Sequence, residues 1–90
     1  MTYGDHMADD NVEAIVGYIS GNARRKQIVE ALSKGAEDVE ALGKLTRIPR
    51  LSLEKMMEEM AGKNIVKKEK NGYKLTDIGE QATTVLKAMR

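Results

Sequence analysis

The feature of this chain that most constrains its fold is a change of hydrophobic period within residues 45–82. Apolar side chains first recur at the i, i+3, i+4 and i+7 spacing of a helix face: Leu53, Met56, Met57 and Met60. Ile65, Val66 and the charged residues 67–70 then lead into Asn71-Gly72, a dipeptide that strongly favours a tight β-hairpin, with residues 73–76 as the return strand. Thr76 or Asp77 follows at once and is suited to cap another helix. The segment therefore predicts a helix, a hairpin and a helix with almost no connecting residues.

The apolar spacing and the capping residues predict five helices, at about 9–20, 23–34, 38–45, 50–62 and 77–89, with a hairpin between the last two. Asn22 is expected to cap the second helix, and Gly35 to end it. Pro49 suits the first turn of the fourth helix, and Asn64 tolerates the left-handed geometry found at helix ends. The predicted fold class is mainly α with a small β-hairpin.

The length of the chain indicates one domain. Ninety residues bury only a modest core, so association with a second copy would help to stabilise it. Residues 1–8 show no periodicity, and we expect them to be a disordered tail or a tag remnant. Residues 9–90 are expected to form the single domain.

The composition excludes several classes of function. The chain has no cysteine, which excludes disulfides, thiolate metal sites and cysteine nucleophiles. Its one histidine is His6, and there is neither a phosphate-binding glycine motif nor an acidic pair backed by a histidine. We therefore expect no enzyme activity, no metal and no cofactor. No apolar run approaches the roughly 18 residues of a membrane span, so a cytoplasmic protein without membrane contact is expected.

The net charge of +1 hides an uneven distribution of charge along the chain. Residues 1–23 carry four acidic residues and no Lys or Arg, whereas residues 47–74 carry eight basic and four acidic residues. A basic segment with an acidic arm fits a polyanionic partner. An ordinary solvated surface is the simpler alternative.

Three segments follow one another in a recognisable order: ISGNARRKQIVEAL at 19–32, DVEALGKLTRIPRLSLEKMMEEMAGKNIVKKE at 38–69 and YKLTDIGEQA at 73–82. Together they resemble the winged helix-turn-helix fold of small prokaryotic transcription regulators, above all archaeal members related to the ArsR and MarR families. The resemblance implies a nucleoid-associated regulator of double-stranded DNA. Helix 38–45 would cross the DNA backbone, helix 50–62 would enter the major groove, and the hairpin, or wing, would reach phosphate or the minor groove.

The resemblance has two limits. The metal-sensing cysteine motif of ArsR-like proteins is absent, because the chain contains no cysteine. The same fold also serves protein contacts, so a protein-interaction module without DNA binding is the alternative function.

Helix 50–62 presents polar side chains opposite its apolar stripe. Arg50 can fork onto guanine, and Lys55 can bind guanine or phosphate. Ser52 can donate or accept a hydrogen bond, and Glu54 can accept from a cytosine amino group. These four residues are the predicted base-reading set. A charged face without any ligand is the alternative.

Other residues near this helix argue in both directions. Arg47, in the turn before it, is expected to contact phosphate. Glu58 and Glu59 fit badly against a phosphate wall and favour the protein-interaction alternative. They also have Lys55 and Lys63 at the spacing of helical ion pairs.

The hairpin and the second helix supply further cations. The hairpin carries Lys67, Lys68, Lys70 and Lys74, for which we expect phosphate contact without sequence specificity. Lysines that only protect an edge strand from aggregation are the alternative. Arg24 and Arg25 open the second helix and can lie near backbone phosphate, or simply form a solvated first turn.

The first and last helices carry more apolar surface than one small core needs, which predicts a homodimer. The predicted interface comprises Val12, Ile15, Val16, Ile19, Val85, Leu86 and Met89. The methionines are expected to fill the core, and Tyr18 and Tyr73 are expected to keep their hydroxyls at the surface.

Overall fold

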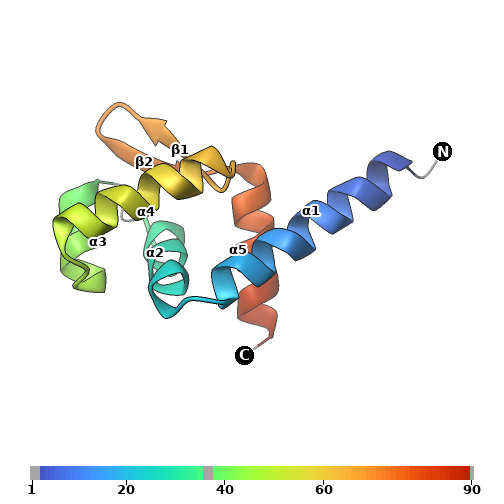
Figure 1. The fold of residues 1–90 in the computed structure, drawn as a ribbon, viewed down its shortest axis with the longest axis horizontal. Helices are drawn as coiled ribbons and strands as arrows, with labels where there is room; N and C mark the ends of the chain where they lie inside the picture. The colour runs from blue at the N-terminus through green and yellow to red at the C-terminus, as the bar shows by residue number, and fades with distance from the viewer. Residues whose placement is uncertain (1–2, 36–37, 90) are drawn as a thin grey trace.

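The computed structural model describes residues 3–35 and 38–89 (Figure 1). Its elements follow one another as α1 Tyr3–Ser20, α2 Ala23–Ser33, α3 Val39–Thr46, α4 Arg50–Gly62, β1 Val66–Glu69, β2 Gly72–Leu75 and α5 Asp77–Ala88. The two strands pair as one antiparallel hairpin. The described chain is thus mainly helical with a small β-hairpin, as predicted. None of its helices combines the length and the apolar character that crossing a bilayer demands.

The first helix is longer than predicted. It begins at Tyr3 rather than near Asp9, because no proline interrupts residues 3–20 and the helix continues N-terminal to its apolar stripe. Residues 1 and 2 of the predicted tail lie outside the described residues. The other four helices begin and end within one residue of their predicted bounds.

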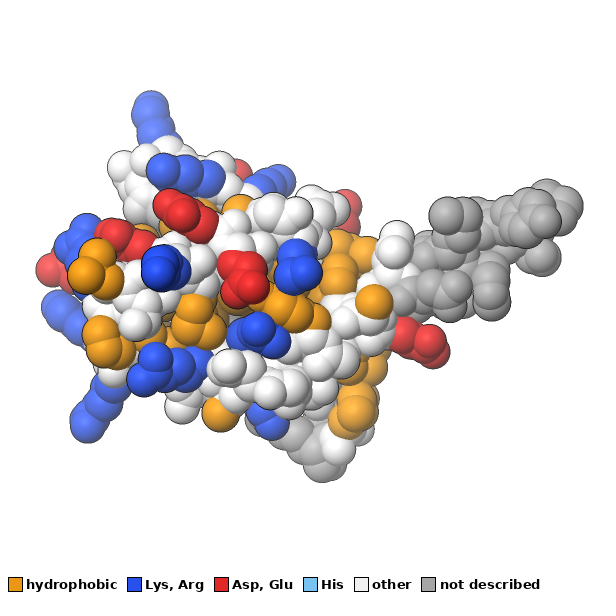
Figure 2. Space-filling view, in the orientation of Figure 1, with side chains coloured by type: hydrophobic (Ala, Val, Ile, Leu, Met, Phe, Trp, Pro, Cys, Tyr) orange, Lys and Arg blue, Asp and Glu red, His pale blue; other side chains and the backbone are white. Residues whose placement is uncertain are grey.

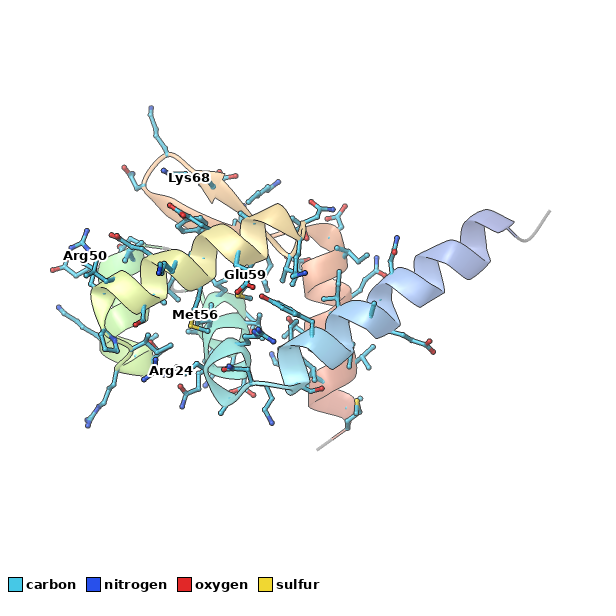
Figure 3. All side chains as sticks on the ribbon, viewed as in Figure 1. Arg24, Arg50, Met56, Glu59 and Lys68 are labelled. Atoms are coloured by element: carbon cyan, nitrogen blue, oxygen red, sulfur yellow. The ribbon has the colours of Figure 1, made fainter. Side chains whose placement is uncertain are left out.

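The core lies where α1, α2, α3, α4 and β1 meet. Its largest fully buried side chains are Ile19, Ile28, Val29, Leu42, Leu53, Met57, Met60, Ile65 and Val66. Met56 is partly buried and points from α4 toward α2 (Figure 3). The methionines of α4 therefore fill the core, as predicted. Met89 and Leu45 do not, since they are 65% and 63% exposed.

The apolar stripe of α1 is largely used within the chain, because α1 packs against α5. Ile19 has no exposed surface and Val16 is 9% exposed, so the prediction that these two side chains form a homodimer interface is wrong. The remaining predicted interface residues fall into two groups, with Val12, Ile15 and Leu86 partly buried against the core and Val85 and Met89 exposed.

A complete Schellman motif ends α4. Asn64 has φ 63°, which confirms its predicted left-handed conformation. The Ile65 N–H donates to the Met60 carbonyl at 2.9 Å, and the Asn64 N–H donates to the Ala61 carbonyl at 3.0 Å. Ile65 is buried directly after this turn, so the chain leaves α4 toward the core and β1 starts beside the helix.

Thr76 ties the end of α4 to the start of α5. Its N–H donates to the Ile65 carbonyl at 3.0 Å, and its hydroxyl donates to the Asn64 carbonyl at 2.7 Å. The same hydroxyl oxygen accepts from the Gly79 N–H at 3.0 Å and so caps α5, as predicted. A Cβ atom on Gly79 would overlap the Ile65 carbonyl oxygen. The close approach of α5 to this carbonyl therefore requires glycine.

The hairpin turns one residue earlier than Asn71-Gly72 predicts. Glu69 pairs with Gly72, so the two residues of the loop are Lys70 and Asn71. The register places Val66 opposite Leu75, and both side chains are buried. This cross-strand apolar contact outweighs the local preference of the Asn-Gly dipeptide.

We expect Gly79→Ala to lower the free energy of unfolding by roughly 1–3 kcal/mol, because α5 must shift away from the Ile65 carbonyl. Gly17→Ala is the matched control. Gly17 is also helical, but nothing lies within 4 Å of the position of an added Cβ. That substitution should raise stability by about 0.5–1 kcal/mol. Urea denaturation of both variants measures the two effects, and equal effects would show that the junction tolerates a side chain.

Candidate functional site

The turn between α3 and α4 has a defined backbone. Arg47 lies in the left-handed region, at φ 60° and ψ 23°, which is uncommon for arginine. Its N–H donates to the Gly43 carbonyl at 2.7 Å. The buried Thr46 hydroxyl donates to the Leu42 carbonyl at 2.7 Å and accepts from the Ile48 N–H at 3.3 Å. These bonds fix the start of α4 and leave the Arg47 side chain exposed there.

The first turn of α4 holds an ion pair. Pro49 precedes the helix as its N-cap, one position earlier than predicted. The Nε of Arg50 donates to a Glu54 carboxylate oxygen at 3.0 Å, and the two side chains are 74% and 44% exposed. The carboxylate that was predicted to accept from cytosine is thus already paired. Both Nη groups of Arg50 have no partner within the described residues.

The most outward ridge of α4 carries Leu51, Lys55 and Glu58, at i, i+4 and i+7. Leu51 lies about 160° around the helix axis from the fully buried Leu53. Its side chain is 80% exposed. The sequence-based site did not include Leu51, although the signal was present: it falls outside the apolar stripe of its own helix.

Four lysines of the hairpin are exposed, namely Lys67, Lys68, Lys70 and Lys74. Lys67 pairs directly with Lys74, and Lys68 pairs with the buried Tyr73. Lys70 lies in the loop of the hairpin. α4 packs against β1, which places the hairpin beside α4 (Figure 1).

Seven exposed basic residues thus surround α4 and the hairpin, and we refer to them as the cationic surface: Arg47, Arg50, Lys55, Lys67, Lys68, Lys70 and Lys74. Figure 2 shows Lys and Arg side chains over the hairpin and along α4, with apolar side chains where α3 meets α4. Ser52, the other predicted base reader, is half-buried. Within the described residues, only Arg50 of the seven has an acidic partner.

Arg24 and Arg25 do not join this surface. Arg25 is partly buried, where its Nη1 donates to the Tyr18 carbonyl at 2.8 Å and its guanidinium stacks 3.7 Å from the centre of the Tyr18 ring. The prediction of a free phosphate contact for Arg25 is therefore wrong. Arg24 is exposed beside the Asn22 cap, which accepts from the Arg24 N–H at 2.8 Å. Figure 3 places Arg24 well apart from Lys68.

Tyr18 is the centre of a contact between α1, α2 and α4. Lys63 Nζ lies 4.9 Å from the centre of its ring, on which Arg25 also stacks. The Tyr18 hydroxyl oxygen is buried without a hydrogen-bond partner, which corrects its predicted surface position. Glu59, on α4, lies near the Tyr18 hydroxyl (Figure 3). The predicted pairing of Glu59 with Lys55 or Lys63 is not formed.

Burial raises the pKa of the Tyr18 hydroxyl above its ordinary value of 10.0, and the Glu59 carboxylate adds to the rise. The Arg25 guanidinium opposes it, because a cation stabilises the phenolate. Sequence reasoning could not anticipate this cluster, since its members lie on three helices separated by up to 45 positions along the chain.

No protein-family model and no curated protein matches this sequence. In residues 3–35 and 38–89, no three His, Cys, Asp or Glu side chains converge into a possible metal site. Around the first turns of α4 the described residues bring together exposed cations and one exposed leucine.

We expect Tyr18 to titrate above the ordinary pKa of tyrosine, and Glu59→Gln to lower its pKa because the substitution removes the neighbouring charge. Phenolate absorbance against pH measures this, and Tyr18→Phe identifies the Tyr18 component. Glu58→Gln is the control, since Glu58 lies on the outward ridge.

The same shift has a consequence for stability. The folded pKa exceeds the unfolded one, so the contribution of Tyr18 to stability is complete below pH 10 and is lost as the pH rises through the folded pKa. A Tyr18 pKa at or below its ordinary value would contradict the buried position of the hydroxyl.

Proposed function

We propose that this chain is a winged helix-turn-helix protein that binds double-stranded DNA as a transcription regulator. The observation that carries the proposal is the cationic surface, on which six of the seven Lys and Arg side chains lack an acidic partner within the described residues. In this proposal α3 crosses the DNA backbone, the first turns of α4 enter the major groove, and the hairpin contacts phosphates.

The hairpin favours a polyanionic partner over a neutral one. Like charges directly opposite each other in a hairpin are destabilising, and Lys67 lies directly opposite Lys74. Phosphate groups would relieve this repulsion and release their own counterions on binding. Protection of an edge strand needs charge, but it does not need two like charges in one cross-strand pair.

The dimensions and position of α4 suit a recognition helix. Its 13 residues span about 20 Å, and a helix of ordinary diameter fills the roughly 12 Å wide major groove. The helix starts at a fixed turn with Arg47, and Arg50, Leu51 and Lys55 project from its first two turns. Recognition helices contact base edges with these N-terminal residues.

Glu54 has a positioning role in this proposal instead of reading cytosine. Its carboxylate binds Nε of Arg50 and restrains a long, exposed side chain. The two Nη groups remain available to fork onto O6 and N7 of guanine. Restraining the guanidinium before binding reduces the entropy that the contact costs.

The proposal includes a homodimer, because two half-sites are usually read by two copies. The exposed end of α5, with Val85 and Met89, and the partly buried Val12, Ile15 and Leu86 supply its interface.

A protein-interaction module is the second candidate function. It is favoured by the exposed Leu45 and by the acidic Glu58 on the outward ridge of α4. Its support is weaker than the sequence indicated, because Glu59, the second carboxylate of the pair, lies near the Tyr18 hydroxyl.

Mixed-sequence duplex DNA should bind with an affinity that falls steeply with salt, because phosphate contacts release counterions. Lys68→Ala with Lys70→Ala should flatten the slope of log K against log salt by about 1.8 if each lysine makes one phosphate contact. Fluorescence anisotropy at several salt concentrations measures the slope. Lys26→Ala with Lys34→Ala removes the same charge from α2 and its C-cap and should leave the slope nearly unchanged. Absence of binding at low salt would support the protein-interaction module.

Arg50→Ala should weaken binding to a preferred site by about 1–3 kcal/mol, with a smaller effect on mixed sequence. Glu54→Ala should also weaken specific binding, although it removes a negative charge near DNA, because Arg50 loses its restraint. Glu58→Ala is the matched control. Glu58 does not pair with Arg50, so its loss should leave DNA binding unchanged or tighten it. Competition binding against the selected site measures all three. Tighter specific binding by Glu54→Ala would show that the ion pair obstructs recognition.

A further inference from the structure

Among the described residues, Leu51 is the most exposed large apolar side chain, at 80%, and it lies in the first turn of α4. Burial elsewhere explains most leucines of this chain, since Leu32, Leu42, Leu53 and Leu75 are buried. Leu51 makes no such contribution to the core. A single exposed leucine is common on protein surfaces, so the exposure of Leu51 assigns no role by itself, and its position on α4 has to supply the argument.

The position of Leu51 identifies what it can reach. It begins the outward ridge of α4, one turn before Lys55, and Arg47 and Arg50 precede it in the chain. Glu54, one turn along α4, is paired with Arg50, and Glu58 lies about 10 Å further along the helix axis, so Arg47 and Lys55 leave a positive balance of charge around Leu51. A partner that touches Leu51 must therefore combine negative charge with a small apolar group.

Duplex DNA has this combination in its major groove. Phosphates line the groove, and the 5-methyl group of thymine is the one apolar group that the base edges present there. From this complementarity we infer that Leu51 contacts a thymine methyl group and that the preferred site contains a T·A pair next to the base pair read by Arg50. The inference rests on the proposed function and extends it from DNA binding to the identity of one base.

The test uses the full chain and a duplex selected from a random library for tight binding. Each thymine of that duplex is replaced in turn by uracil, which lacks the 5-methyl group and otherwise keeps the same base-pairing edge. Removal of one methyl group from contact should weaken binding of the unsubstituted protein about fourfold at one thymine of each half-site. Leu51→Ala should bind the thymine and uracil duplexes equally at that position.

Leu45→Ala is the matched control, because Leu45 is also an exposed leucine but belongs to α3. This variant should keep the fourfold preference for thymine. Thermal unfolding followed by circular dichroism should show that Leu51→Ala folds normally, since the side chain removed is exposed.

The outcomes separate the inference from the proposal on which it rests. Indifference of the unsubstituted protein to uracil at every position, or the same fourfold loss in Leu51→Ala, overturns the thymine contact alone and leaves DNA binding standing. Absence of binding to any duplex at low salt overturns both the proposed function and this inference.

Discussion

The carbonyl oxygen of Ile65 is the group on which the arrangement of α4, the hairpin and α5 depends. It accepts the Thr76 N–H at 3.0 Å, and α5 approaches it so closely that Gly79 cannot carry a side chain. The Schellman turn at Asn64 delivers this carbonyl to the junction, since the chain leaves α4 directly into it. The hairpin therefore has both of its ends fixed, one at the end of α4 and the other at the start of α5. These fixed ends keep the hairpin lysines beside α4. The cationic surface therefore depends on the Ile65–Thr76 junction as well as on its own basic residues.

Local sequence patterns predicted most of this framework because most of it is local. The stripe of α4, the left-handed Asn64 and the Thr76 cap each depend on residues within one or two helical turns. The hairpin register is different. Asn71-Gly72 favours a loop one residue later, but the observed pairing is set by Val66 against Leu75, nine positions apart in the chain. Cross-strand burial decides between registers, and no short window contains that information.

The candidate site was predictable in part for the same reason. Helical periodicity predicts the exposure of Arg50 and Lys55, and strand alternation predicts that of Lys67. Lys68 is exposed although alternation puts it on the strand face of the buried Val66. The stacking of Arg25 on the Tyr18 ring, which removes it from the cationic surface, could not be predicted, because it depends on how α1 and α2 cross. The helical i, i+4 spacing of Arg50 and Glu54 favours the observed ion pair over contact of the Glu54 carboxylate with a base. The exposure of Leu51 follows from its position outside the apolar stripe of α4.

The positions and partners of the acidic residues on α4 determine which end of the helix can approach a polyanion. Glu54 neutralises part of Arg50 in the first turn, and Glu59 lies near the Tyr18 hydroxyl at the end of the helix. Glu58 is then the carboxylate left on the outward ridge, in the third turn, beyond Leu51 and Lys55. The outward ridge is thus apolar and basic at its N-terminal end and acidic toward its C-terminal end. A helix with this polarity can approach a phosphate-lined groove only with its N-terminal turns first, tilted so that Glu58 stays clear of the backbone. The fixed turn at Arg47 and the hairpin beside α4 place cations on both sides of such an approach.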